Sequence, residues 1–142
     1  MKSQIKISEI LLDYFKLNNR QIMVSTYTGL NHIIFLSNDE KYLFSKKALG
    51  KNNFLYLSWF DGIVDFIRKN GGRVKKGNGH NSKVGYGKCT KDTLCEYIAI
   101  NCYGHKIGES TFDPVFIVCA ILENAGICKN ERGYISLNLQ FR

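Results

Sequence analysis

The chain has 142 residues, of which 44% are hydrophobic and 23% are charged, and lysine plus arginine exceed aspartate plus glutamate by eight. These values are typical of one globular domain with a substantial core, which excludes wholesale disorder, and the positive charge favours an anionic partner. No apolar run approaches the roughly 20 residues of a membrane span, and the first residues lack the apolar region of a signal peptide, so we expect a cytoplasmic protein.

The first part of the chain, residues 1–56, predicts a helix followed by short strands. Apolar residues at positions 7, 10, 11, 14 and 15 have the spacing of an amphipathic helix, with Ser8 available as its N-cap. From Gln21 onward, β-branched and aromatic residues predict strands over 22–27, 32–36 and 41–44, and residues 54–56 are either a short strand or a lead-in to the next helix. We interpret this part as an extension of the following domain or as a surface that forms a homodimer.

The second part, residues 57–142, predicts three helices and a terminal β-hairpin. The helices are expected over 58–70, 90–103 and 114–125, and the hairpin over 128–141. Ser58 is the expected N-cap of the first helix, and Asp113-Pro114 is a start signal for the third. Val115 to Leu122 is apolar on every side, which is typical of a buried helix. The fold class expected for the whole chain is α+β.

A basic, glycine-rich stretch separates the first two helices of the second part. Between Arg68 and Lys91 the chain has eight lysines and arginines, six glycines and no acidic residue. Cationic side chains and close backbone approach at glycines suit contact with a polyanion, with release of condensed counterions. The other interpretation is a solvated loop that is basic because loops are polar. Charge clustering favours nucleic-acid contact.

The end of the chain resembles the close of a winged helix-turn-helix domain. The residues that carry the likeness are Ala120 to Ile127, with the phrase Leu122-Glu123-Asn124-Ala125-Gly126-Ile127, followed by the Arg132-Gly133-Tyr134 turn. The resemblance covers about residues 58–142, and it extends loosely to the winged-helix modules of some restriction endonucleases. It implies a three-helix unit with a β-hairpin wing that binds double-stranded DNA, as a regulator or as the recognition module of a restriction, defence, phage or mobile-element system.

Base reading by the third helix is not expected, because a recognition helix needs polar side chains that face the bases. We therefore predict contact mainly with the DNA backbone, with any base specificity from the asparagines and the histidine of the basic stretch. Ser110 and Thr111 could contact phosphates at the start of the third helix. The predicted DNA-binding residues are Arg73, Lys75, Lys76, Asn78, His80, Asn81, Lys83, Lys88, Lys91 and Arg132.

The sequence predicts no catalytic residue, no metal site and no cofactor. None of the six glutamates has a lysine two places on, and Asp39-Glu40-Lys41 is interpreted as a charged hairpin turn rather than a nuclease motif. His80, Asn81, Asn101 and His105 lack the compact spacing of a His-Asn-His nuclease. Three of the five cysteines, Cys95, Cys102 and Cys119, fall inside helical patterns, as reduced core cysteines do.

Two other functions stay open. A small basic protein could inhibit a nucleic-acid-processing defence complex by binding the protein itself, or the chain could be a nuclease with an atypical site. The salt dependence of duplex binding separates a DNA binder from an inhibitor, because only a DNA binder loses affinity steeply as salt rises.

Overall fold

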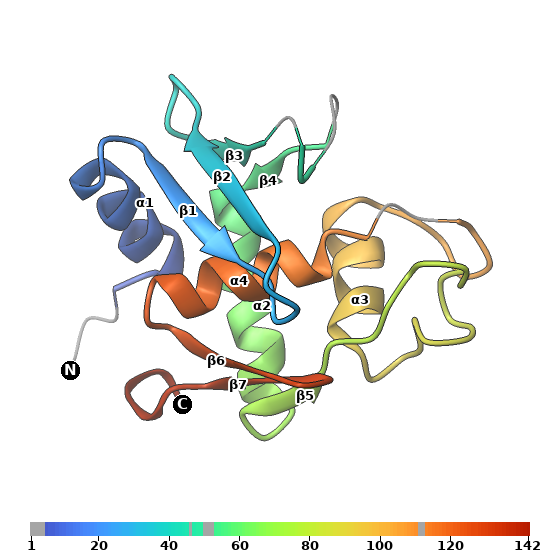
Figure 1. The fold of residues 1–142 in the computed structure, drawn as a ribbon. Coiled ribbons are helices and arrows are strands. Elements are labelled where there is room, and N and C mark those ends of the chain that lie inside the picture. Colours follow the sequence, from blue (N-terminus) through green and yellow to red (C-terminus); the bar gives the residue numbers. More distant parts are fainter. Residues whose placement is uncertain (1–4, 46, 50–52, 111–112) are drawn as a thin grey trace.

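The N-terminal part of the fold is an antiparallel sheet with a helix at its side. The structure is a computed structural model that describes residues 5–45, 47–49, 53–110 and 113–142 (Figure 1). The elements in chain order are α1 (Ile7–Leu17), β1 (Gln21–Ser25), β2 (Asn31–Leu36), β3 (Tyr42–Phe44) and β4 (Leu55–Tyr56). The strands form one sheet in the order β1-β2-β3-β4. The expected helix and strands are confirmed, with ends shifted by one or two residues.

The C-terminal part combines three helices with a second antiparallel sheet. Its elements are α2 (Leu57–Lys69), β5 (Arg73–Lys75), α3 (Leu94–Tyr97), a π-helical turn η1 (Ile98–Cys102), α4 (Val115–Asn124), β6 (Cys128–Glu131), β7 (Tyr134–Leu137) and a final 3₁₀ turn η2 (Leu139–Phe141). The sheet order is β5-β7-β6, so the strand after α2 pairs with the second strand of the terminal hairpin. The α+β class is confirmed.

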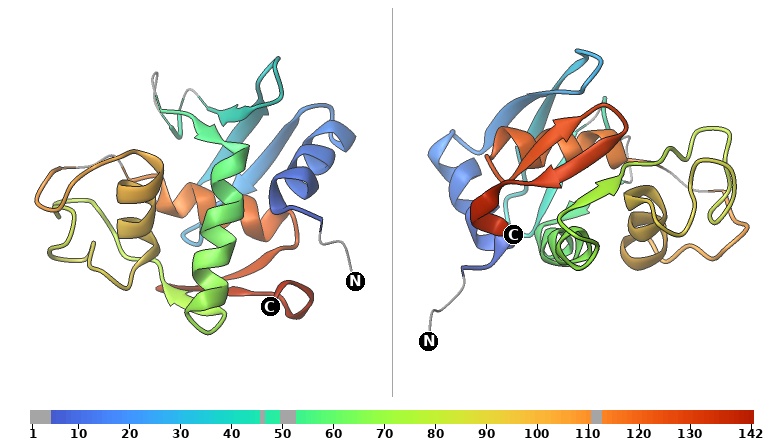
Figure 2. Two further views of the ribbon diagram at one scale, coloured as in Figure 1. Left: turned by 180° about the vertical axis from the view of Figure 1, so that it is seen from behind. Right: turned by 90° about the horizontal axis from the view of Figure 1, so that it is seen from below.

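One side of the N-terminal sheet packs on the helices. Alternate residues of β1 and β2, such as Val24 and Ile34, are buried, as expected for strands with a single covered face. In Figure 2 (left), which views the molecule from behind, α2 runs in front of this sheet and α1 lies beside it. The α2 side chains Phe60, Ile63 and Ile67 are fully buried, and each such burial stabilises the fold by about 2 kcal/mol.

Helix α4 lies at the centre of the molecule. It packs against β1 of the first sheet and against β6 of the second. Every residue from Ile117 to Leu122 is buried, while Phe116 is 39% exposed. The prediction of a buried third helix is therefore confirmed. The predicted boundary after residue 56 falls between β4 and α2, and a single cluster of buried residues continues across it.

The helix starts differ from the expected ones. α1 and α2 begin one residue before the serines proposed as caps, and the amide of Ser8 donates instead to Asp61 Oδ1 (2.9 Å). The second helix of the C-terminal part begins at Leu94 rather than Thr90. Its N-cap is Thr93, whose Oγ1 accepts a hydrogen bond from the Glu96 amide (3.2 Å).

Candidate nucleic-acid interface

Residues 76–93, here called the basic platform, form an ordered loop that projects beside α3 (Figure 1). The loop is closed by backbone hydrogen bonds from the Asn78 amide to the Lys88 carbonyl (3.0 Å) and from the Gly85 amide to the Cys89 carbonyl (2.8 Å). The side chains of Val84 and Cys89 are fully buried beneath it. Internal hydrogen bonds and these two buried side chains therefore hold the platform in one shape.

Glycine is required where the platform turns back on itself. Gly77 has φ +72°, and a Cβ at this position would lie 2.7 Å from the Lys88 carbonyl oxygen and 2.7 Å from Thr93 Cβ. Both neighbours belong to the platform, so neither is free to move away. The glycines were expected to let the backbone come close to a polyanion. At Gly77 the close approach is instead between two segments of the platform, and it brings Lys88 next to the chain that leaves β5.

A carboxylate joins the platform to α4. Asp113 Oδ2 accepts a hydrogen bond from the Gly79 amide (2.5 Å), and Asp113 Oδ1 accepts one from the Val115 amide (3.0 Å). Asp113 was expected to be the N-cap of the third helix with Pro114 as its first residue, but the N-cap position belongs to Pro114 and α4 begins at Val115. The Asp113 carboxylate, one residue earlier, still binds the first helical amide while it also fixes the platform. The backbone amides that bind this carboxylate offset its charge locally.

The tip of the terminal hairpin lies next to the start of the platform. The Lys76 amide donates to the Gly133 carbonyl (3.0 Å), and Lys75 is paired with Tyr134 in the β5–β7 register. Arg132, which precedes Gly133 at the tip, is therefore close to the chain at Lys75. The structure brings these two predicted DNA-binding residues together, although they are 57 positions apart in the sequence.

Arg73 is exposed but already has partners. Its guanidinium lies 3.8 Å above the centre of the Tyr134 ring, and its Nε is 3.3 Å from Glu131 Oε2. The hydroxyl of Ser136 and then Arg73 hold the pKa of Glu131 below its usual value. The charge of Arg73 is thus partly compensated by a carboxylate at salt-bridge distance.

Most of the other predicted residues have exposed side chains. These are Lys75, His80, Asn81, Lys83, Lys88, Lys91 and Arg132. Asn78 is half-buried, and its Oδ1 accepts a hydrogen bond from the His80 amide (2.8 Å), so this side chain shapes the turn. Asn81 has φ +59°, a conformation that asparagine tolerates better than most residues.

The prediction for Lys76 is corrected, because only 2% of this residue is exposed. Its Nζ lies 5.1 Å from the centre of the Tyr27 ring, and burial lowers the pKa of the ammonium. Lys76 therefore faces the interior and is not placed to reach a phosphate. Buried Val74 precedes it by two residues, so the alternation of β5 continues through Lys76 and points it inward.

Two residues next to this surface were missed in the sequence analysis. Tyr86 is 61% exposed on the platform. Lys106 is exposed on the following loop, which is tied to the platform by a hydrogen bond from the Gly108 amide to the Val84 carbonyl (2.8 Å). A basic patch with an interleaved aromatic residue is a sequence signal that could have indicated Tyr86. Nothing local in the sequence indicates that Lys106 lies near the platform.

The approach to α4 is only partly described. Ser110 is exposed and forms an antiparallel bridge with Lys83, which places it beside the platform. Thr111, the other residue proposed to contact phosphates there, lies outside the described residues.

The search for a metal site concerns groups of histidine, cysteine, aspartate and glutamate side chains. Within residues 5–45, 47–49, 53–110 and 113–142, no group of three or more histidine, cysteine, aspartate or glutamate side chains is arranged to hold a metal ion. Cys89 Sγ and Cys95 Sγ lie 2.9 Å apart in the interior, and burial raises the pKa of both thiols. Both sulfurs therefore pack as neutral thiols.

Comparison with known proteins gives no relative from which a function can be transferred: no family model, no curated protein and no solved structure matches the chain. Across the described ranges, each helix is too short or too polar to cross a bilayer.

Proposed function

We propose that the protein binds double-stranded DNA, mainly through phosphate contacts made by the basic platform together with Lys75 and Arg132. The proposal rests on one observation, which is the number of exposed cations here without a carboxylate partner. In the part of the chain that the structure describes, no salt bridge within 4.0 Å involves Lys75, Lys83, Lys88, Lys91 or Arg132. Such side chains bind phosphates without first breaking an internal ion pair.

The order of elements supports a winged-helix arrangement for residues 58–142. A helix, a short strand, two further helices and a hairpin follow one another, and the short strand pairs with the second hairpin strand. In this proposal the β6–β7 hairpin is the wing, with Arg132 at its tip.

One feature makes the proposed binding mode unusual for a helix-turn-helix protein. Helix α4, which stands where a recognition helix is expected, is buried against β1 and β6. Its middle therefore has no polar side chain that could read a base. We infer contact with the phosphate backbone, with little discrimination between sequences.

A triple charge reversal tests the proposal. We expect the combination of Lys83→Glu, Lys88→Glu and Arg132→Glu to abolish duplex retention at moderate salt. Less drastic alanine substitutions at the same positions should reduce the slope of log K against log salt by about 3, because each phosphate contact contributes about 0.9. Equilibrium binding to a fluorescent duplex, measured over a range of salt concentrations, gives both quantities.

A second triple variant controls for net charge. Lys6, Lys16 and Lys41 are exposed, lie in the N-terminal part and give the same charge change when replaced by glutamate. We expect this control to retain most of the duplex affinity. Equal losses in the two triple variants would show that net charge alone attracts DNA. Absence of salt-dependent duplex binding by the wild-type protein would contradict the proposal and favour an inhibitor that binds protein.

A further inference from the structure

The outer face of the N-terminal sheet is at least partly exposed, and none of its outward strand positions is charged, although Lys47 lies beside it at the cavity described below. Alternation with buried neighbours such as Val24 and Ile34 identifies the outward positions of its four strands. The nine outward residues are Gln21, Met23, Ser25, Asn31, Ile33, Phe35, Tyr42, Phe44 and Tyr56. In a chain with 23% charged residues, a solvated sheet face is expected to contain some of them.

Aromatic rings form a continuous row across this face. Phe35 stacks on Phe44 with ring centres 5.5 Å apart, and Tyr42 lies 5.9 Å from Tyr56, which in turn lies 5.0 Å from Trp59. Tyr42 and Phe44 are linked by a 6.2 Å ring contact. The rings hold one another in place, so the face is a preformed surface rather than a set of independent side chains.

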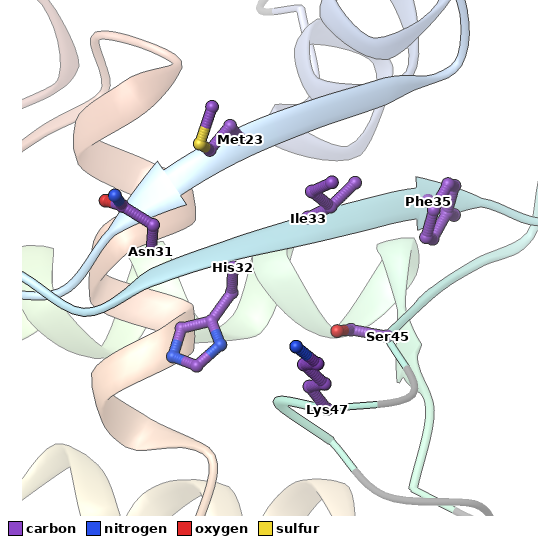
Figure 3. A pocket seen from close by; sticks show the side chains of 7 residues that line it. All are labelled: Met23, Asn31, His32, Ile33, Phe35, Ser45 and Lys47. Atoms are coloured by element: carbon purple, nitrogen blue, oxygen red, sulfur yellow. The ribbon is translucent and has the colours of Figure 1, made fainter.

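The other half of the face is hollowed. Met23 is 62% exposed and Ile33 is 46% exposed. Figure 3 shows the residues around a cavity at this point, with helices behind the sheet. The cavity has a volume of about 370 Å³, and its lining is mixed: the apolar residues are Met23, Ile33 and Phe35, and the polar ones are Asn31, His32, Ser45 and Lys47. A side chain of a partner that enters this hollow meets both apolar and polar groups.

We propose that this face binds a second copy of the same chain, forming a symmetric dimer in which the two sheets stack face to face. Two molecules that each carry a net charge of +8 repel one another, and an uncharged face is where they approach at low electrostatic cost. Stacked sheets lie about 10 Å apart, so the apolar and aromatic side chains of the two copies would interdigitate.

The chemistry of the face argues against other occupants. A nucleic acid or an anionic membrane needs cations, and none of the nine outward residues is basic. Among the described residues that line the cavity, one is basic, Lys47. The basic platform, which carries the exposed Lys83, Lys88 and Lys91, projects instead beside α3 (Figure 1).

The outward residues leave area that a second copy can cover. Met23, Ile33 and Tyr56 are 42–62% exposed. These three side chains hold on the order of 300 Å². The exposed Gln21, Ser25 and Asn31 and the partly exposed aromatic row add to this area, toward the roughly 800 Å² that each partner contributes to a standard interface.

Sedimentation equilibrium tests the proposal directly. The wild-type protein at about 100 µM should sediment at twice the chain mass of 16.2 kDa. Ile33→Lys and Met23→Lys each place one ammonium group from every copy in the proposed interface. We expect each variant to weaken dimerisation at least a hundredfold, because a buried interface that gains unpaired like charges is strongly disfavoured.

Leu139→Lys is the matched control. Leu139 is 85% exposed on the final turn, so the substitution adds the same charge outside the sheet face. This variant should remain dimeric. Far-ultraviolet circular dichroism checks the fold of each protein, and Met23→Lys provides the test if Ile33→Lys does not fold.

Two results would overturn the proposal. A wild-type protein that is monomeric at 100 µM has no such interface, and a dimer that persists in a folded Met23→Lys or Ile33→Lys variant uses another surface. The outcome is independent of DNA binding, because all three substitutions leave the platform cations in place. Retention of the variants on immobilised heparin measures that second property separately.

Discussion

The basic platform and the outer face of the N-terminal sheet are both exposed, but they differ in almost every physical property. The platform gathers unpaired cations and is held by backbone hydrogen bonds and glycine turns. The sheet face has no charge at any outward position and is held by contacts between aromatic rings. The difference indicates that the two surfaces suit different partners, a polyanion for the first and an apolar protein surface for the second.

The shape of the platform should be sensitive to one methyl group. Gly77→Ala is expected to cost about 3 kcal/mol, because it combines an unfavourable positive φ with overlap between the new Cβ and the Lys88 carbonyl. Urea unfolding measures the loss of stability, and duplex affinity should fall with it because Lys88 is displaced.

Gly29 provides the control for this prediction. It also has positive φ, but a Cβ added there meets no atom within 4 Å. Gly29→Ala should therefore cost only about 1 kcal/mol and leave duplex affinity unchanged. Equal effects at the two glycines would mean that the platform does not depend on close packing at Gly77.

Replacing the buried cation should stabilise the protein. Lys76→Met removes the cost of burying an ammonium and is expected to raise the free energy of unfolding by about 1–2 kcal/mol near neutral pH, with a higher Tm. Burial lowers the pKa of Lys76 below its ordinary value of 10.5. Between the lowered pKa and pH 10.5, the unfolded state therefore binds more protons than the folded state, and the free energy of unfolding rises with pH. Wild-type stability thus recovers there, and the difference between the two proteins should shrink.

The neighbouring lysine should behave in the opposite way. Lys75 is exposed, so Lys75→Met should leave thermal stability nearly unchanged and weaken duplex binding. Lys76→Met should leave duplex binding unchanged. A loss of affinity on changing Lys76 instead of Lys75 would reverse the assignment of these two side chains.

The smallest expected effect concerns the ion pair beside the wing. Glu131→Gln should free Arg73 for phosphate and raise duplex affinity by about two- to fivefold at neutral pH. Because the pKa of Glu131 is lowered in the folded state, its contribution to stability is present above the usual value of 4.5 and is lost as pH falls through the lowered value. The Tm difference between wild type and variant should therefore vanish in acid.

Much of the fold follows from local sequence patterns. The alternation of the first strands, the helical spacing of α1 and α2 and the all-apolar α4 each specify one element and its burial. Strand β5 was not predicted, because its three residues are too few to show an alternation of buried and exposed side chains. Lys76 was assigned to the surface for the same reason, since its inward direction follows only once β5 is known.

The candidate interface was predictable in composition but not in geometry. Its cations are visible in the sequence as one basic stretch. The contact between that stretch and Arg132 depends on the β5–β7 pairing. The position of Lys106 depends on the hydrogen bond from the amide of the nearby Gly108 to the Val84 carbonyl. Such non-local contacts leave no periodic signal in a single sequence.

Trp59, the single tryptophan of the chain, links the sheet to the helices. Its ring lies 5.0 Å from Tyr56 of β4 and 4.9 Å from Tyr103, beyond the π-helical turn. At such separations, excitation energy absorbed by either phenol passes efficiently to the indole, whose emission then dominates the fluorescence spectrum. The protein thus contains its own optical probe, placed where loosening of the sheet from the helices would alter the emitted light.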